Sequence, residues 1–298
     1  MQTLLIVGSG DIARRTLPLL RGRYRLLALV RSDENADCWR RMGVLPIRAD
    51  LDDRKSLARL RGLADLVLHC APPNNDGSID RRTRNLLASL AAAKSLPRRL
   101  VYISTTGVYG DCQGKTIDET RPCRPGSARS GRRVDAEQRL REFGKRQPVT
   151  VTLLRAPGIY GPGRLPLERL RAGTPALLPE QDVFTNHIHA DDLAAACVAA
   201  LRRGCANRAI NVVDDSAMRA ADYFDRVADL AGLPHPPRLP ANDLRQTISP
   251  LQWSFLCESR QIRNTRLKRE LKLRLRHPTV DDGLAAILNG PANESPSC

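Results

Sequence analysis

The sequence has few aromatic residues and no long apolar run. Phe, Trp and Tyr together make up 4% of the chain. No segment is apolar over the roughly 18 residues that a membrane-spanning helix requires. Met1 leads into a short apolar run and then into glycines, without the basic and apolar segments of a secretion signal. We therefore expect a cytoplasmic protein without a membrane partner.

Metal-binding cysteine patterns are also missing. The eight cysteines include no Cys-x-x-Cys pair, and no group of Cys and His has the spacing of a zinc site. His187 and His189 would face one side of a strand, but no acidic or Cys partner lies at metal-site spacing in the sequence. We therefore expect no bound metal.

Lysine and acidic residues are scarce relative to arginine. The net charge is +16, and the 48 basic residues comprise 42 Arg and 6 Lys. Three explanations stay open: a compositional habit of the source organism, a polyanion-binding surface, and an anionic small substrate. The arginines are spread along the whole chain, whereas a nucleic-acid-binding protein usually gathers them on one face. We therefore expect a small-molecule substrate and no nucleic-acid partner, in a monomer or homodimer.

The length and composition predict a folded protein. The chain has 298 residues, of which 42% are apolar and 27% charged, and this composition excludes disorder. A chain of this length forms one large domain or two modest ones. It buries about 75% of the surface that its unfolded form exposes, so it needs no disulfide or metal to fold.

Apolar runs alternate with helical segments over the first half of the chain. Runs of this kind are typical of parallel strands that are buried on both faces. The expected strands are 4–7, 26–30, 44–47, 66–69, 100–104 and 149–154. One helix is expected from 11 to about 22, and another follows the second strand and ends at 42. Further helices are expected over 53–60 and 79–93 and around 136–143. This alternation predicts an α/β fold with a Rossmann-type doubly wound parallel sheet.

The pattern loosens after about residue 158, where five prolines fall within a short stretch. We expect a dinucleotide-binding domain over 1–160 and a small C-terminal substrate lobe over 161–298. The two parts are interleaved, because the apolar run 209–213 is suited to return to the sheet. The tail beyond about Pro236 is basic and helical in patches.

A glycine-rich turn follows the first expected strand. Gly8-x-Gly10-x-x-Ala13 fits the dinucleotide fingerprint, with alanine in the third position. The first glycine permits the tight turn, the second lets the backbone approach a pyrophosphate, and the third small residue allows close packing of helix and strand. The following helix directs its N-terminus at the anion. The alternative is a glycine turn that binds no ligand.

The end of the second strand bears on the choice between NADP and NAD. Arg31 stands there, and an arginine can pair with the 2′-phosphate of NADP. An NAD site usually has an acid at this point, and Asp33 and Glu34 lie just beyond. We expect NADP to be preferred over NAD, with a solvated Arg31 as the alternative.

Several further segments resemble one family. They are Ala49-Asp50-Leu51, Ser104-Thr105-Thr106-Gly107-Val108-Tyr109-Gly110, Tyr160-Gly161-Pro162-Gly163 and His187-Ile188-His189-Ala190-Asp191-Asp192. Together they resemble the extended short-chain dehydrogenase/reductases, in their NAD-dependent epimerase/dehydratase branch that works on nucleotide sugars. The resemblance runs from residue 1 to about 290, and the Ser-Thr-Thr-x-Val-Tyr-Gly and Tyr-Gly-Pro-Gly elements are its most specific parts.

The resemblance implies roles for individual residues. Thr105 matches the catalytic Ser/Thr, whose hydroxyl would bond the reacting substrate oxygen; the alternative is a hydroxyl satisfied by the backbone. Thr106 and Tyr109 would lie near the substrate, while His189 and Asp192 would tie the lobe to the sheet. The implied cofactor contacts are Gly8, Ser9, Gly10, Asp11 and Ile12 at the pyrophosphate, Arg31, Asp50, Leu51, Ala71 and Pro72 toward the adenosine, and Pro157, Gly158 and Ile159 at the nicotinamide.

The sequence departs from the family at its acid/base pair. The family has a Tyr and, four residues later, a Lys on one helix face. With Glu137 as the anchor of the alignment, Arg129 stands in place of the Tyr and Arg133 in place of the Lys. A guanidinium stays protonated, so Arg129 cannot act as the base. The two arginines either bind an anionic substrate group or form a solvated helix face.

These observations leave two main hypotheses for function. The first is an NAD(P)-binding oxidoreductase or epimerase/dehydratase-like enzyme acting on a small polar substrate such as a nucleotide sugar. The second is a non-catalytic NAD(P)-binding regulator or redox sensor, resembling the atypical members of the family that lack the Tyr/Lys pair. The sequence alone does not name the substrate.

Overall fold

Seven parallel strands form the central sheet of the computed structural model, which describes residues 1–289. Their order is β3-β2-β1-β4-β5-β7-β12, and each neighbouring pair is parallel. The strands are β1 (Thr3–Val7), β2 (Arg25–Val30), β3 (Leu45–Arg48), β4 (Leu66–His69), β5 (Arg99–Thr105), β7 (Thr150–Ala156) and β12 (Arg208–Asn211). The doubly wound Rossmann-type sheet predicted from the apolar runs is therefore confirmed.

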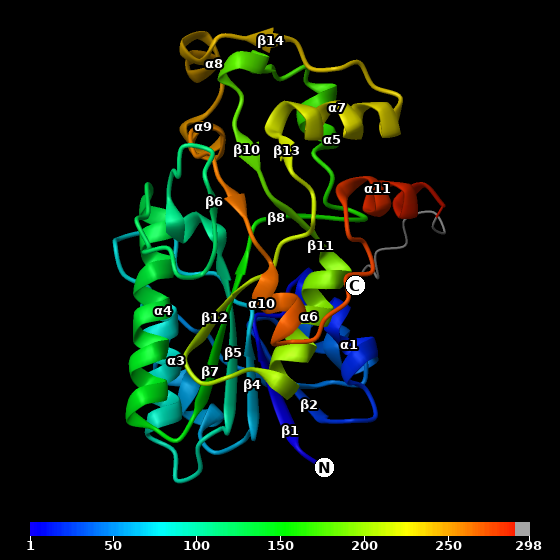
Figure 1. The fold of residues 1–298 in the computed structure, drawn as a ribbon. Helices are drawn as coiled ribbons and strands as arrows, with labels where there is room; N and C mark the ends of the chain where they lie inside the picture. The colour runs from blue at the N-terminus through cyan, green and yellow to red at the C-terminus, as the bar shows by residue number, and fades with distance from the viewer. Residues whose placement is uncertain (290–298) are drawn as a thin grey trace.

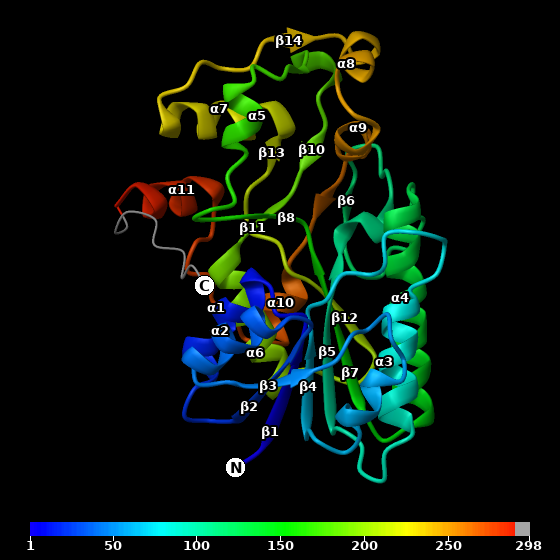
Figure 2. The ribbon, with the colours of Figure 1, turned by 180° about the vertical axis from the view of Figure 1, so that it is seen from behind.

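Helices cover both faces of this sheet, because alternate strand residues point to opposite sides. One face packs against α1 (Asp11–Leu20), α2 (Asp33–Arg41), α6 (Ala190–Arg203) and α10 (Thr265–Arg269). The other packs against the short 3-10 helix η1 (Ser56–Leu60), α3 (Arg81–Ala91) and α4 (Ala128–Arg146). Figures 1 and 2 show α3 and α4 on one side of the strands and α1 and α6 on the other.

The predicted helices differ from the observed ones in two places. The segment expected to be helical over 53–60 is helical only at Ser56–Leu60, because the Ser56 hydroxyl bonds the Asp50 N–H and the Asp53 carbonyl and fixes a turn. The helix expected around 136–143 extends over Ala128–Arg146, since Ser127 and Ser130 form a capping box at its start. It therefore includes both arginines at the positions of the family pair.

The second lobe lies beyond the carboxyl ends of the strands (Figure 1). Its elements are β6 (Thr116–Ile117), β8 (Gly158–Tyr160), α5 (Leu167–Arg171), β9 (Ala176–Leu177), η3 (Pro179–Gln181), β10 (Phe184–Thr185), β11 (His187–His189), β13 (Met218–Arg219), α7 (Ala220–Ala231), β14 (Arg238–Leu239), α8 (Ala241–Thr247), α9 (Pro250–Leu256), β15 (Gln261–Ile262) and α11 (Val280–Asn289). A further 3-10 helix, η2 (Thr106–Tyr109), follows β5. Within residues 1–289, no helix combines the length and apolar character needed to cross a membrane.

Chain segments cross between the two parts. β12 returns to the edge of the sheet beside β7, as the apolar run at 209–213 predicted. Asp192 on α6 accepts the backbone N–H groups of Arg276 and His277 at 2.7 and 2.8 Å, which ties the C-terminal segment to the helix behind the sheet. The lobe is thus held against the strand ends, where a parallel sheet of this order places its ligand site.

Candidate active site

The glycine turn after β1 runs against the loop that follows β4. Gly8 has a φ of +98°, and a Cβ there would lie 2.4 Å from the backbone nitrogen of Ala71. Only glycine fits this close approach and this backbone conformation. Gly8 therefore shapes the turn by packing against the protein itself.

Gly10, unlike Gly8, does not pack closely against another described segment of the protein. It is the N-cap of α1 with a φ of −85°, and no atom of the described residues other than its two chain neighbours lies within 4 Å of a Cβ built on it. The space in front of Gly10 is therefore open, and the free N–H groups of the first helical turn lie beside it. A phosphate group of a dinucleotide fits this arrangement, because a helix N-terminus attracts an anion and a side chain at Gly10 would enter the same space.

The turn forms one end of a cavity of about 480 Å³ at the carboxyl ends of the strands. Eleven of the thirteen residues expected at the cofactor line it, namely Gly8, Ser9, Gly10, Asp11, Ile12, Arg31, Asp50, Leu51, Ala71, Pro72 and Ile159. The other two, Pro157 and Gly158, line a second cavity of about 310 Å³. The sequence motifs therefore converge in space, although they lie far apart in the chain.

An ion network fixes the glycine turn to the lobe. Asp11 accepts hydrogen bonds from Arg15 at 2.9 Å and from Arg164, which follows the Tyr-Gly-Pro-Gly segment, at 2.6 Å. Arg15 also bonds Asp191 at the start of α6 at 2.8 Å and the Pro162 carbonyl at 3.0 Å. Since Arg164 lines the cavity as well, this network places a guanidinium beside the phosphate-binding turn.

The outer end of the first cavity is positively charged. Arg31 follows β2, is exposed and lines the cavity, whereas Asp33 and Glu34 do not line it. The Asp33 carboxylate instead pairs with Arg48 on β3. The acid that could hold a ribose hydroxyl thus has another partner, and the arginine faces the cavity.

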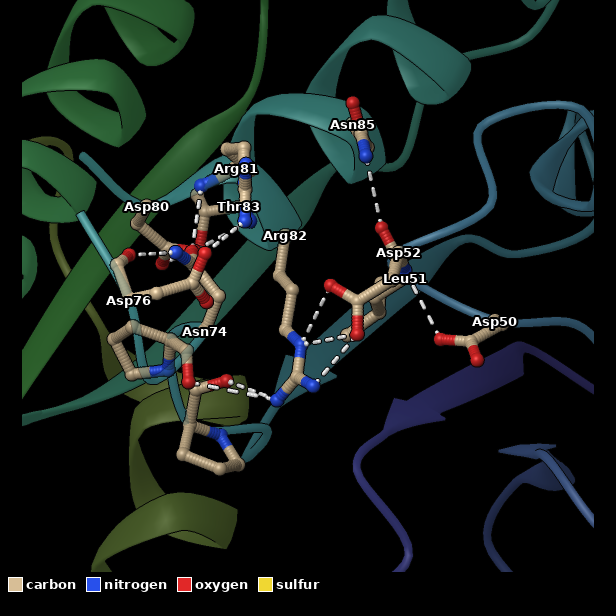
Figure 3. A network of polar contacts seen from close by, with 12 residues as sticks. Asp50, Leu51, Asp52, Asn74, Asp76, Asp80, Arg81, Arg82, Thr83 and Asn85 are labelled. Atoms are coloured by element: carbon tan, nitrogen blue, oxygen red, sulfur yellow. Dashed lines mark hydrogen bonds and ion pairs between the residues drawn. The ribbon is translucent and has the colours of Figure 1, made fainter.

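A second arginine at this end joins two loops and is neutralised by an acid. Arg82, from the first turn of α3, forms a bidentate ion pair with Asp52, with contacts of 2.7 to 3.1 Å, and reaches the carbonyls of Pro72 and Pro73 (Figure 3). These bonds lower the pKa of the Asp52 carboxyl, and the charge of Arg31 contributes. The loop after β4 is therefore joined to the loop after β3, where Asp50 and Leu51 lie.

The second cavity begins at the end of β5. Thr105 and Thr106 line it, as expected for residues near the substrate. The Thr105 hydroxyl accepts the N–H of Gly107 at 3.2 Å, so its own proton stays available for a ligand. The backbone alternative and the ligand-bonding role are thus compatible for this side chain.

Arg129 and Arg133 project from the first two turns of α4 toward this cavity. Arg133 is half-buried, lines both cavities, and donates to the Tyr102 hydroxyl at 2.9 Å and the Ile103 carbonyl at 2.6 Å. Arg129 is exposed and lines the second cavity, with its guanidinium over the Phe255 ring. Neither arginine belongs to a helix face that points away from the site.

A buried ion pair holds α4 in this position. Glu137 accepts bonds from Arg155 on β7 at 2.6 and 3.0 Å and from the Ser104 hydroxyl on β5 at 2.7 Å. Both side chains of the ion pair are only 4% exposed. The acid that anchors the sequence alignment thus connects the helix to the two strands that end at the second cavity.

Tyr109 corrects one expectation. Its ring is fully buried, and its hydroxyl donates to Asn211 on β12 at 2.7 Å, so it does not line either cavity. Burial raises the pKa of Tyr109 to about 12. Tyr160 is also buried and donates to the Thr279 carbonyl at 3.1 Å. Neither phenol takes the place of the missing family tyrosine.

The histidines of the lobe form a cluster that the sequence spacing did not indicate. His189 and His277 have ring centroids 4.0 Å apart, and a carboxylate oxygen of Asp191 lies 3.8 Å from His189 Nδ1. Candidate ligand atoms of these three residues lie within 4.8 Å of one another. However, Asp191 already pairs with Arg15, and His189 Nδ1 accepts the Asp191 N–H to cap α6. These contacts account for Asp191 and His189 without a metal ion.

The chain matches the model of the family described as "NAD dependent epimerase/dehydratase family" over residues 4–212. It belongs to this family. In Escherichia coli K12, "Protein YeeZ" is 32% identical over 177 residues, which cover 58% of this chain and 61% of that protein. A ketoreductase of a farnesylated dihydroquinoline oxide from Stigmatella aurantiaca is 31% identical over 148 residues, or 46% of this chain and 44% of that protein. The chain thus spans less than two thirds of the length of either relative.

Solved structures share the fold of this family member over 96–97% of the chain. A functionally unknown conserved protein from Silicibacter pomeroyi has a TM-score of 0.78 and 29% identity, covering 97% of this chain and 99% of that one. UDP-glucose 4-epimerase from Thermus thermophilus, solved as a complex with NAD, has a TM-score of 0.74 at 22% identity, covering 96% and 98%. At this identity the second likeness establishes the fold alone.

Some lining residues were missed from the sequence. For two of them the sequence has a signal nearby, because each lies in the first turn of a helix. Asn35 is in α2, and its amide bonds the Ser9 hydroxyl at 3.2 Å; Arg82 follows the N-cap of α3. No local signal marks Phe255, Glu258 and Arg260, which enter the second cavity from the lobe. Only the fold brings these three residues to the ends of β5 and α4.

Proposed function

We propose that this family member binds NADP in preference to NAD in the first cavity. We further propose that it acts as an oxidoreductase or epimerase/dehydratase-like enzyme on a small polar substrate in the second. The observation that carries the proposal is that both cavities share Arg133, at the helix position of the family's lysine. A reacting carbon beside Thr105 would thus lie next to the ring end of the cofactor cavity. Nucleotide sugars are one candidate substrate class, since solved neighbours include epimerases of UDP-glucose.

The residues present suit one half of the family chemistry. When bound, a nicotinamide dinucleotide supplies or accepts a hydride. The Thr105 hydroxyl can hydrogen-bond the substrate oxygen, and the Arg133 guanidinium can stabilise negative charge that develops on it. Neither group exchanges a proton readily near neutral pH. The proton that accompanies the hydride would therefore come from water or from the substrate.

The test is a calorimetric titration with NADP and NAD, followed by NADPH oxidation across a panel of sugar nucleotides and carbonyl compounds. The proposal expects saturable dinucleotide binding, tighter for NADP, and oxidation with at least one member of the panel. The proposal would be refuted if neither NADP nor NAD bound.

A second candidate function is dinucleotide binding without turnover, as in a regulator or redox sensor. It is favoured by the arginines at 129 and 133 and by the burial of Tyr109 and Tyr160 away from the cavities. Intact NADP binding with no oxidation of NADPH across the panel would select this function.

Replacing Arg31 tests the cofactor choice. We expect Arg31→Ala to weaken NADP binding by about 1.5–3 kcal/mol, the range for a hydrogen bond to a charged group, and to leave NAD nearly unaffected. Arg25→Ala is the matched control, because it removes the same charge from the other end of β2, where the exposed side chain does not line the cavity. Calorimetry with both dinucleotides measures the effect, and equal losses for NADP and NAD would show that Arg31 does not contact the 2′-phosphate.

Replacing Thr105 tests the remaining family hydroxyl. Removal of one hydrogen-bond donor to a developing oxyanion costs about 10²–10³-fold, so the loss of this bond in Thr105→Val should cost at least about tenfold in turnover. Thr105→Ser keeps the hydroxyl and should retain most of the rate. Steady-state kinetics with the substrate found in the panel measures both variants, and full activity in Thr105→Val would exclude the role.

A further inference from the structure

The second cavity carries more positive charge than the protein itself neutralises. Its lining includes three guanidinium groups, those of Arg129, Arg133 and Arg260, and one carboxylate, that of Glu258. These groups leave a surplus of two positive charges. Thr105 lies in the same lining, so the surplus surrounds the point where the substrate oxygen is expected.

Arg133 is held in place but has no acidic partner among residues 1–289. Its Nη1 donates to the Tyr102 hydroxyl at 2.9 Å and to the Ile103 carbonyl at 2.6 Å. Both acceptors are neutral, because burial raises the pKa of Tyr102 to about 12. The remaining N–H groups, on Nε and Nη2 of Arg133, donate to no acceptor among residues 1–289. Arg133 is thus a fixed cation with donors to spare.

Arg129 makes no hydrogen bond or ion pair with the described residues. Its guanidinium lies over the Phe255 ring of α9, 4.0 Å from the ring centroid, in cation–π geometry. Partial burial of the guanidinium lowers the pKa of Arg129. The negative charge of Glu258 raises this pKa, and the positive charges of Arg133, Arg132 and Arg260 lower it. The aromatic contact orients the group and leaves the donors on its edge available.

Arg260 comes from the lobe and completes the set. Its Nη1 donates to Glu258 at 2.6 Å and to the Gly110 carbonyl at 2.9 Å. The side chain is 13% exposed, and its buried Nε has no partner. The Nη2 group donates to no acceptor among residues 1–289 and is not enclosed as Nε is, so it stays available to a ligand that enters the cavity.

Three other arginines near the cofactor cavity are neutralised. Arg82 pairs with Asp52, Arg164 with Asp11, and Arg15 with both Asp11 and Asp191. The protein therefore places acids beside these cations, although it has more basic than acidic residues overall. Arg31, at the first cavity, has no such partner among residues 1–289, and neither do Arg129 and Arg133, which both face the second cavity.

We propose that the substrate presents an oxyanion, a carboxylate or a phosphoryl group, to Arg129, Arg133 and Arg260 beside the reacting carbon. The inference rests on the proposed function, since it concerns the substrate of that site. A guanidinium offers parallel N–H groups that match the paired oxygens of either anion. A neutral sugar ring would leave the two surplus charges of this lining without a counter-charge. Where the family has a tyrosine that transfers a proton, this protein thus has an arginine that binds an anion.

The test is calorimetric titration of the NADP-saturated protein at constant ionic strength with inorganic phosphate, malonate and the neutral malonamide. NADP saturation occupies the glycine turn, which would otherwise bind phosphate. We expect saturable binding of at least one of the two anions and none of malonamide. Phosphate binding indicates a phosphoryl group on the substrate, and malonate binding indicates a carboxylate.

Arg129→Gln is the decisive variant, because Arg129 lines the second cavity and not the first. We expect it to weaken anion binding at least tenfold and to leave NADP affinity unchanged. Arg146→Gln is the matched control, since it removes the same charge from the far end of α4, where the side chain is 77% exposed. Equal losses in the two variants, or no anion binding by the native protein, would overturn the inference.

The failure of the proposed function is distinguishable from this outcome. If NADP does not bind, the dinucleotide proposal fails. The anion titrations are then repeated on the free protein. A tenfold loss in Arg129→Gln relative to Arg146→Gln would still support the anion site, and equal affinities would overturn it.

Discussion

We expect Gly10→Val to abolish dinucleotide binding while leaving the fold largely intact. The first cavity provides the reason, since, apart from its two chain neighbours, nothing in residues 1–289 lies within 4 Å of a Cβ at Gly10, and its φ of −85° is accessible to any residue. A valine side chain would therefore be accommodated without the ligand. It would then occupy the space that a pyrophosphate needs to approach the N-terminus of α1.

The measurement is calorimetry with NADP, together with urea unfolding of the same variant. The neighbouring glycine serves as the contrast. Gly8→Ala should destabilise the protein, because its Cβ would lie 2.4 Å from the Ala71 nitrogen at a φ of +98°. Unchanged NADP affinity in Gly10→Val would remove the glycine turn from the cofactor site.

This division of roles between two glycines shows what the motif could predict. The spacing Gly8-x-Gly10-x-x-Ala13 located the turn, and its place between a strand and a helix indicated a dinucleotide. The structure adds that Gly8 is required by contact with Ala71, which lies after β4. The sequence around Gly8 could not predict this contact, because the two segments lie far apart in the chain.

The sheet itself was predictable for a physical reason. A strand buried on both faces must be apolar throughout, so runs such as 4–7 and 66–69 identify β1 and β4 to within one residue. Helix α4 was harder to delimit, because it is rich in arginine over the turns that carry residues 129 and 133. Its start depends on the capping box of Ser127 and Ser130.

The second cavity was only half predictable. Thr105 and the two arginines of α4 followed from the family motif, because the motif lies on β5 and on the helix that leads to β7. Arg260 and Phe255 come from the lobe, more than a hundred residues further along the chain. Tyr109 was misplaced because its motif position does not say that its hydroxyl turns to Asn211 on β12.

The buried pair of Glu137 and Arg155 carries the largest expected effect on stability. Glu137 is 3% exposed, as is Arg155, and three hydrogen bonds join this carboxylate to Arg155 and Ser104. Removing one partner of a buried pair leaves an uncompensated charge, which costs about 3–5 kcal/mol. We therefore expect Glu137→Ala to lower the free energy of unfolding by about that amount.

The exposed pair on the same helix is the control. Glu142 lies 3.7 Å from Arg146, and the two side chains are 60% and 77% exposed. Water screens such a pair, so it contributes at most about 1 kcal/mol. Glu142→Ala should therefore change the free energy of unfolding by less than about 1 kcal/mol, as measured by urea titration.

A double variant separates the charge from the packing. Replacing both partners by apolar side chains of similar volume is often neutral, because no buried charge remains. We expect Glu137→Leu combined with Arg155→Met to recover most of the stability that Glu137→Ala loses. If the double variant is as unstable as the single one, the pair acts through its hydrogen-bond geometry. Recovery would show that Glu137→Ala is unstable because it leaves the Arg155 charge unpaired between α4, β5 and β7.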